Sequence, residues 1–167
     1  MRYKAVEHKT RDESTENTLH ACKFHHSRTE EEHREHKDVL YNAVVVCPEE
    51  ITGDTWEEEY YYLRGEAKHC LGDYEEAIID FDTAISLYGN SSKYYHMRAC
   101  SKYILDRLKE AEIDVTKAIS ISPKWNITYL LRGDIRFLMD NYSEAIADYR
   151  KFIEINPDDI RGYMRLA

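Results

Sequence analysis

An internal repeat with a stride of 34 residues constrains this chain more than any other feature of its sequence. Tyr129 falls on Tyr95 and then on Tyr61 when the register moves back by that stride. The same shift aligns Arg132 with Arg98 and Arg64, Gly133 with Ala99 and Gly65, Ala145 with Ala111 and Ala77, Asp148 with Asp114 and Asp80, and Ile153 with Ile119 and Ile85. No insertion or deletion interrupts the register, so the sequence predicts an array of similar units that bury their apolar faces on one another.

The sequence of each copy predicts two helices joined by a short turn. In the first copy, Gly72 ends a helix expected over 56–71, and the apolar residues that follow recur with helical periodicity. The later copies predict helices over 92–105, 108–121, 126–139 and 142–155. Asn141 followed by Glu144 predicts a capping box at the start of the last of these. Because the turns are short, the two helices of each copy should run antiparallel.

Composition and charge exclude several classes of function. The formal net charge is −9 and no basic stripe stands out, which argues against a nucleic-acid partner. No apolar run approaches the roughly 20 residues that cross a bilayer, and the first ten residues lack the apolar core of a signal peptide. The four cysteines form no CxxC pair, which favours free thiols in a reducing, cytoplasmic compartment.

The N-terminal segment, residues 1–55, is polar and rich in His and Glu, and we expect it to be mostly disordered. A helix over about 30–46 and a degenerate repeat within 17–50 are open alternatives for part of it. His20, Cys22, His25 and His26 have the chemistry of zinc ligands. Their spacing matches no closed zinc module, so a solvated tail is the preferred interpretation, and no metal or cofactor is expected.

Three arginines and three aspartates recur together, sixteen residues apart within each copy: Arg64 and Asp80, Arg98 and Asp114, and Arg132 and Asp148. A charge on the inner face of a helix is tolerated when an opposite charge meets it, because an unpaired buried charge is very costly. We therefore predict a series of Arg–Asp pairs between the two helices of each copy, in preference to three ligand-binding arginines.

The stretch from Trp56 to Asp159 resembles three tetratricopeptide repeats, at about 58–91, 92–125 and 126–159, and residues 160–167 resemble the opening of a fourth. The resemblance rests on Y-x2-R-G in the first helix and on G-D-Y-x2-A-I-x-D-F-x2-A-I in the second. Val115 departs from the pattern by replacing the aromatic residue. The resemblance implies an all-α fold, an α-solenoid of antiparallel helix pairs that forms a right-handed superhelix.

The resemblance also implies that the first helices line a concave groove, and that the protein is a non-catalytic adaptor, as most of the family are, many of them co-chaperones. Helical phase assigns four residues of each first helix to the groove: Glu59, Tyr62, Glu66, His69, Lys93, His96, Cys100, Tyr103, Ile127, Leu130, Asp134 and Phe137. Such a lining suits an extended or helical peptide of another protein. The alternative is that Leu130, Phe137 and Tyr103 only contact neighbouring repeats.

One subclass of the family grips the C-terminal carboxylate of heat-shock chaperones with two Lys, two Asn and an Arg. The five corresponding positions here would hold Tyr62, Glu66, Met97, Ile127 and Leu131. If the clamp began one repeat later, only Arg161 and Arg165 would be basic, so the sequence argues against such a ligand.

Enzyme motifs are missing from the sequence, which has no phosphate loop, no H-E-x-x-H and no nucleophile elbow. The neighbours Cys100 and His96 lack a visible third group to orient them. The expected function is therefore protein binding. Self-association through the apolar residues of the C-terminal end, in a structural fragment of a longer repeat protein, is the alternative.

Overall fold

The computed structural model describes residues 57–167, and within that range every regular element is an α-helix. The helices are α3 (Glu57–Leu71), α4 (Tyr74–Leu87), α5 (Ser92–Ile104), α6 (Leu108–Ile121), α7 (Asn126–Leu138), α8 (Tyr142–Ile155) and α9 (Ile160–Leu166). Their bounds lie within one residue of the helices expected from the sequence, so those predictions are confirmed. The expectations for residues 1–55, including the His-rich segment and the helix over 30–46, lie outside the described residues.

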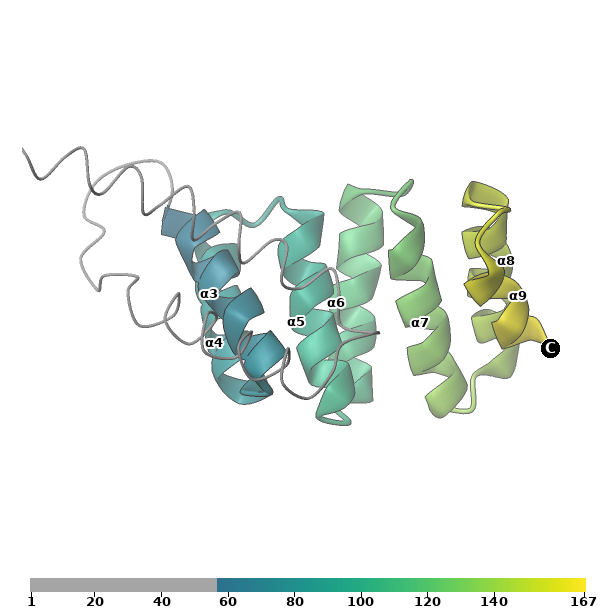
Figure 1. Cartoon of the computed structure of the whole chain (residues 1–167), viewed down its shortest axis with the longest axis horizontal. Helices are drawn as coiled ribbons and strands as arrows, with labels where there is room; N and C mark the ends of the chain where they lie inside the picture. Colours follow the sequence, from purple (N-terminus) through teal and green to yellow (C-terminus); the bar gives the residue numbers. More distant parts are fainter. Residues whose placement is uncertain (1–56) are drawn as a thin grey trace, which may run out of the picture. The chain divides into compact units, whose positions relative to one another are not determined.

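The chain divides into two compact units after Leu87. In the first unit α3 packs against α4. In the second unit α5 packs against α6, α6 against α7, α7 against α8, and α8 against α9. Figure 1 shows α5, α6 and α7 side by side, as expected for consecutive helices joined by short connections.

The turn inside each repeat reverses the chain through one left-handed residue. Gly72, Asp106 and Asp140 have φ angles of 92°, 59° and 62° and are separated by the 34-residue stride. At all three the backbone makes both hydrogen bonds of a Schellman motif, which satisfies carbonyls at the end of the first helix. The capping box predicted for α8 is wrong, because the Asn141 side chain makes no capping hydrogen bond.

Within each repeat the two helices approach closely where a small residue faces a larger one. A Cβ added to Gly65 would lie 2.7 Å from the Phe81 ring, so the glycine makes room for the aromatic side chain. Two repeats pair glycine with an aromatic ring and the middle repeat pairs alanine with a smaller side chain: Gly65 with Phe81, Gly133 with Tyr149, and Ala99 with Val115. The volumes at the two positions compensate each other, which keeps the interior close-packed.

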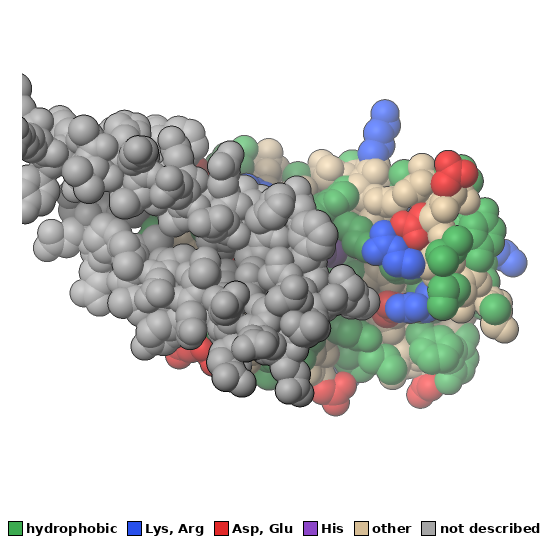
Figure 2. All heavy atoms as spheres, in the orientation of Figure 1, with side chains coloured by type: hydrophobic (Ala, Val, Ile, Leu, Met, Phe, Trp, Pro, Cys, Tyr) green, Lys and Arg blue, Asp and Glu red, His purple; other side chains and the backbone are tan. Residues whose placement is uncertain are grey.

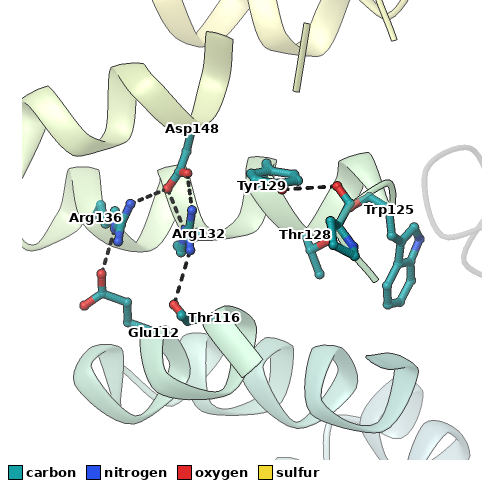
Figure 3. Close-up of polar contacts among 9 residues, drawn as sticks. Glu112, Thr116, Trp125, Thr128, Tyr129, Arg132, Arg136 and Asp148 are labelled. Atoms are coloured by element: carbon teal, nitrogen blue, oxygen red, sulfur yellow. Dashed lines mark hydrogen bonds and ion pairs between the residues drawn. The ribbon is translucent and has the colours of Figure 1, made fainter. Parts of the chain in front are cut away.

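The connection between α6 and α7 is also held by local polar contacts. The Tyr129 hydroxyl donates to the Pro123 carbonyl oxygen at 3.1 Å, and the buried Thr128 hydroxyl donates to the Trp125 carbonyl. Figure 3 shows both tyrosine and threonine directed toward this connection. These bonds give the Pro123 carbonyl a partner and the Trp125 carbonyl a second one, in addition to the Thr128 backbone N–H.

Candidate functional site

The three repeated arginines bind the three repeated aspartates, as the sequence predicted. In each pair the Arg Nε lies 2.8 to 2.9 Å from one carboxylate oxygen and Nη2 lies 2.5 to 2.6 Å from the other. The aspartate side chains are 2 to 4% exposed. This bidentate geometry is the strong form of an Arg–carboxylate contact, and it joins the two helices of a repeat.

A second cation, which the sequence analysis did not assign, approaches each buried aspartate. Lys68, Lys102 and Arg136 lie 2.8 to 2.9 Å from Asp80, Asp114 and Asp148, respectively. These residues also recur at the 34-residue stride, so the signal was present in the sequence. Each carboxylate is thus neutralised by two basic side chains, and these six cations are engaged within their own repeats.

Two of these cations extend the network from one repeat to the next. Arg136 donates through Nε to a Glu112 carboxylate oxygen at 2.7 Å, while its Nη1 contacts Asp148 at 2.8 Å. Arg132 also lies 3.4 Å from the Thr116 hydroxyl. Figure 3 shows Arg132 and Arg136 between Asp148 on one side and Glu112 and Thr116 on the other. The network therefore links α6 to the α7–α8 pair.

The residues that the sequence assigned to a groove differ widely in exposure. Four of them are buried, with 6 to 8% of their surface exposed: Tyr62, Glu66, His96 and Leu130. Leu130 packs in a cluster with Tyr149 and Phe152. Phe137 is 53% exposed, with its ring 5.4 Å from that of Tyr142. The others are partly buried.

In the second unit, Asp134 is the centre of a polar cluster that joins three helices, α7, α8 and α9. Its carboxylate accepts a hydrogen bond from the Tyr149 hydroxyl of α8 at 2.9 Å. Arg165 of α9 binds the same carboxylate through two contacts of 2.7 and 3.1 Å. Burial and the Asp134 charge together raise the pKa of Tyr103, on α5. The charge of the predicted residue Asp134 therefore acts on the predicted residue Tyr103, and α9 contributes Arg165 to the Asp134 carboxylate.

At the other end of α5, three predicted residues lie close to Trp125. The His96 ring lies 4.6 Å from the Trp125 ring, and its Nε2 is 3.6 Å from the Cys100 sulfur. Lys93 and Trp125 line an open pocket of about 350 Å³, together with Tyr88. Burial raises the pKa of the Cys100 thiol to about 12, so the sulfur stays protonated at neutral pH. A protonated thiol is a poor nucleophile, which argues against cysteine catalysis at this pair.

In the first unit, the predicted residues of α3 contact each other and α4. The Tyr62 hydroxyl donates to the Glu66 carboxylate. The Tyr62 ring also lies 6.1 Å from that of Phe81, and the His69 ring lies 5.2 Å from that of Tyr74. Tyr62 and His69 thus contact α4 and help to hold α3 and α4 together.

Residues 57–167 contain no group of three or more His, Cys, Asp or Glu side chains placed to hold a metal ion. None of the helices in that range is long and apolar enough to span a membrane.

Paired antiparallel helices, a constant stride and small residues facing large ones define a helical-repeat scaffold, an all-α solenoid. Family models described as "Tetratricopeptide repeat" match residues 58–91 and residues 92–124 and 128–159, which is more than half of the chain. The chain belongs to the tetratricopeptide repeat family.

Solved structures of the same kind are similar to this chain. The Arabidopsis OM64 TPR domain is 30% identical, with a TM-score of 0.64, and the match covers 66% of this chain and 91% of that one. MamA is 20% identical, with a TM-score of 0.73, covering 84% of this chain and 82% of that one. The first TPR of Spaghetti (RPAP3), bound to the HSP90 peptide SRMEEVD, is 23% identical with a TM-score of 0.66, covering 70% and 93%. A search of curated protein sequences found no match.

Proposed function

We propose that the protein is a non-catalytic interaction scaffold that binds a peptide segment of another protein on the first-helix face of its second unit. We define this face by Lys93 and Tyr103 on α5 and by Ile127, Asp134 and Phe137 on α7. The observation that carries the proposal is the Asp134 cluster, in which side chains of α7, α8 and α9 converge while Phe137 remains more than half exposed.

Such a face is suited to binding because its polar groups are already held in place. Tyr149 and Arg165 orient the Asp134 carboxylate, so little ordering is required when a ligand arrives. Tyr103 and Phe137 supply aromatic surface, which commonly carries most of the binding energy of an interface. Domains of the same fold from Spaghetti (RPAP3) and human RPAP3 bind HSP90 and HSP70 peptides, respectively, so the fold can hold a peptide ligand.

The side chains of this face argue against a ligand with a free C-terminal carboxylate of the chaperone type. Arg165 binds Asp134, and Arg161 binds Asp159 with a shortest contact of 2.6 Å. Two of the basic groups that could hold a carboxylate are thus already neutralised. We therefore propose a different peptide chemistry, with aromatic or aliphatic anchors for Tyr103 and Phe137.

The test is a selection from a phage-displayed random peptide library, followed by fluorescence anisotropy with the full chain. Tyr103→Ala and Phe137→Ala should each raise the Kd of the selected peptide about 5- to 30-fold, since the loss of an aromatic anchor costs about 1–2 kcal/mol. A synthetic SRMEEVD peptide should bind at least about tenfold more weakly than the selected peptide.

The matched control is Ile113→Ala, which removes a side chain that is 70% exposed on the second helix α6. It should leave the Kd unchanged, and circular dichroism should show the same helix content in all variants. The proposal fails if no peptide is enriched, or if Tyr103→Ala and Phe137→Ala bind the selected peptide as the unaltered chain does.

Self-association through α9 is a second candidate, because Ile160 and Met164 are 69% and 65% exposed. Light scattering over a concentration series would show a rise in mass if it occurs, and a constant monomer mass would exclude it. A reducing, cytoplasmic location is also part of the proposal, supported by the free thiols of Cys70 and Cys100.

A further inference from the structure

The open pocket of about 350 Å³ beside Trp125 lies where α5 begins and α6 ends, and all of its lining residues belong to the second unit. We call it the Trp125 pocket. Figure 1 places the start of α5 and the connection from α6 to α7 at the upper edge of this unit, and Figure 2 shows mostly hydrophobic and uncharged groups there. Ligand pockets span roughly 300–1,000 Å³, so this one has room for a single large side chain.

The serines that line the Trp125 pocket differ from the other serines of residues 57–167. The other four each donate a hydrogen bond through the side chain, three to backbone carbonyls and one to a carboxylate: Ser86, Ser101, Ser120 and Ser143. The three serines of the pocket are partly buried, and their hydroxyls make no hydrogen bond to another residue of that range: Ser91, Ser92 and Ser122. These hydroxyls are therefore available to a ligand.

The walls of the pocket include two aromatic rings, one of which is fixed in place. The Trp125 ring lies 4.6 Å from the His96 ring, and the Trp125 carbonyl accepts hydrogen bonds from the Thr128 backbone N–H and hydroxyl. Figure 3 shows the Trp125 side chain projecting from the connection, away from Tyr129. Tyr88, which is 50% exposed, supplies the second ring. An aromatic ligand group can stack against such walls without first ordering them.

The lining of the pocket is not part of the repeated framework. The Arg–Asp pairs that hold the helices together recur in every repeat. At the 34-residue stride the pocket residues instead fall on chemically different ones: Tyr88 on Ser122, Lys93 on Ile127, and Trp125 on Asp159. The fold of a repeat therefore does not require this combination of side chains.

The chemistry of the lining favours one kind of ligand side chain. Lys93 is the only charged residue among the lining residues, so a Lys or Arg side chain would find no carboxylate there. A purely apolar side chain would cover the serine hydroxyls without offering them a hydrogen bond. Tyrosine combines an aromatic ring with a hydroxyl that both donates and accepts, as the serine hydroxyls do.

We propose that the Trp125 pocket binds a tyrosine side chain of the peptide ligand, with its ring against Trp125 and Tyr88 and its hydroxyl bonded to the pocket serines. The source of this tyrosine rests on the function proposed above, and Lys93 belongs both to the first-helix face and to the pocket. Binding of the side chain itself can be measured without the peptide.

The probe for the test is N-acetyl-L-tyrosinamide, titrated into the ¹⁵N-labelled full chain carrying Trp56→Phe. Trp125 is then the single tryptophan, so one indole N–H resonance reports on the pocket. This resonance should shift saturably, with a Kd on the order of 1 mM for so small a ligand. N-acetyl-L-phenylalaninamide should bind about 3- to 10-fold more weakly, because it lacks the hydroxyl.

A variant without the pocket hydroxyls makes the test specific. In the chain that also carries Ser91→Ala, Ser92→Ala and Ser122→Ala, the tyrosine probe should bind only as weakly as the phenylalanine probe, whose own affinity should not change. The matched control carries Ser86→Ala, Ser120→Ala and Ser143→Ala and should keep the preference for tyrosine. Circular dichroism should show the same helix content in all three chains.

The proposal is overturned if the Trp125 resonance does not respond to the tyrosine probe, or if the two probes bind the unaltered pocket with equal affinity. It is also overturned if the pocket variant and the matched control lose the preference for tyrosine equally.

The peptides selected by phage display separate this proposal from the function on which it rests. They should contain a tyrosine whose replacement by phenylalanine weakens binding about 3- to 10-fold in the unaltered chain and not in the pocket variant. Peptides that depend on Tyr103 and Phe137 but not on the pocket serines would support the first-helix face and exclude the pocket. Binding of the tyrosine probe without any enriched peptide would overturn the peptide-binding function and support the preference of the pocket for tyrosine.

Discussion

At the scale of the residue, each repeat of this protein contains a nearly buried aspartate held by two cations. Asp148 is 3% exposed and contacts Arg132 and Arg136 at 2.6 and 2.8 Å. Burying a carboxylate is costly unless hydrogen bonds and an opposite charge replace the lost water. The arginines that stand out most in the sequence therefore serve the fold and are not available to a ligand.

Asp148→Ala should lower the free energy of unfolding by about 3 kcal/mol, since removal of one partner of a buried pair leaves uncompensated charges. Urea denaturation followed by circular dichroism measures the change. Asp158→Ala, at an exposed position, is the control and should change stability by less than about 0.5 kcal/mol. Equal losses in the two variants would show that the pair does not stabilise the fold.

Cys100 provides a prediction about pH. Its folded-state pKa of about 12 lies above the ordinary value of 9.0, so burial favours the neutral thiol. The stabilisation that this provides is fully present below pH 9 and is lost as the pH rises toward 12.

In a chain with Cys22→Ser, Cys47→Ser and Cys70→Ser, the alkylation of Cys100 by iodoacetamide should show no plateau up to pH 10. The same chain in concentrated urea should reach half of its maximal rate near pH 9, as an ordinary thiol does. Mass spectrometry measures both rates. A half-maximal rate near pH 9 in the folded chain would contradict the burial of the thiol.

At the scale of the element, helix pairing depends on a matched volume at one contact. Gly133 meets the Tyr149 ring, whereas the corresponding contact of the previous repeat is made by Ala99 and Val115. The pairing explains why a residue with low helix propensity recurs inside a first helix. Either combination fills the space, but an alanine opposite the aromatic ring would not fit.

Gly133→Ala alone should destabilise the protein by about 1–3 kcal/mol, because the added Cβ overlaps the Tyr149 ring. The double variant with Gly133→Ala and Tyr149→Val reproduces the contact of the middle repeat and should recover part of this loss. Urea midpoints of the two variants and of Tyr149→Val alone form a double-mutant cycle. Strictly additive losses would show that the two volumes do not compensate.

At the scale of the whole molecule, the described chain consists of a two-helix unit and a five-helix unit, each with its own packing. Within the five-helix unit, Arg136 and Arg132 join consecutive repeats through Glu112 and Thr116. Such contacts contribute the nearest-neighbour coupling on which the stability of repeat proteins depends.

Glu112→Gln should lower the free energy of unfolding by about 0.5–1 kcal/mol, more at low salt than at high salt, since the pair is partly screened by solvent. Urea denaturation at two salt concentrations measures the effect. The control is Glu154→Gln, which removes the exposed pair with Lys151 and should have almost no effect. A loss that is the same in both variants would exclude a role for Glu112 in coupling the repeats.

Much of this fold was predictable because the same local sequence pattern occurs in three copies. The helices and the Arg–Asp pairs follow from stride and periodicity, which depend on local geometry. The second cations at Lys68, Lys102 and Arg136 recur at the same stride, but their role depends on how near each long side chain comes to the carboxylate.

The sequence alone determined that paired helices stack at a constant stride, because periodic apolar residues can be buried in no other way. Tertiary structure decided which of the predicted groove residues are exposed. Leu130 is buried in a core cluster, while Phe137 at the same helix phase is open to solvent. Tertiary structure also brings the side chains of Tyr149 and Arg165 to the Asp134 carboxylate. These features depend on how consecutive helices pack on one another in three dimensions, which a repeating local pattern does not encode.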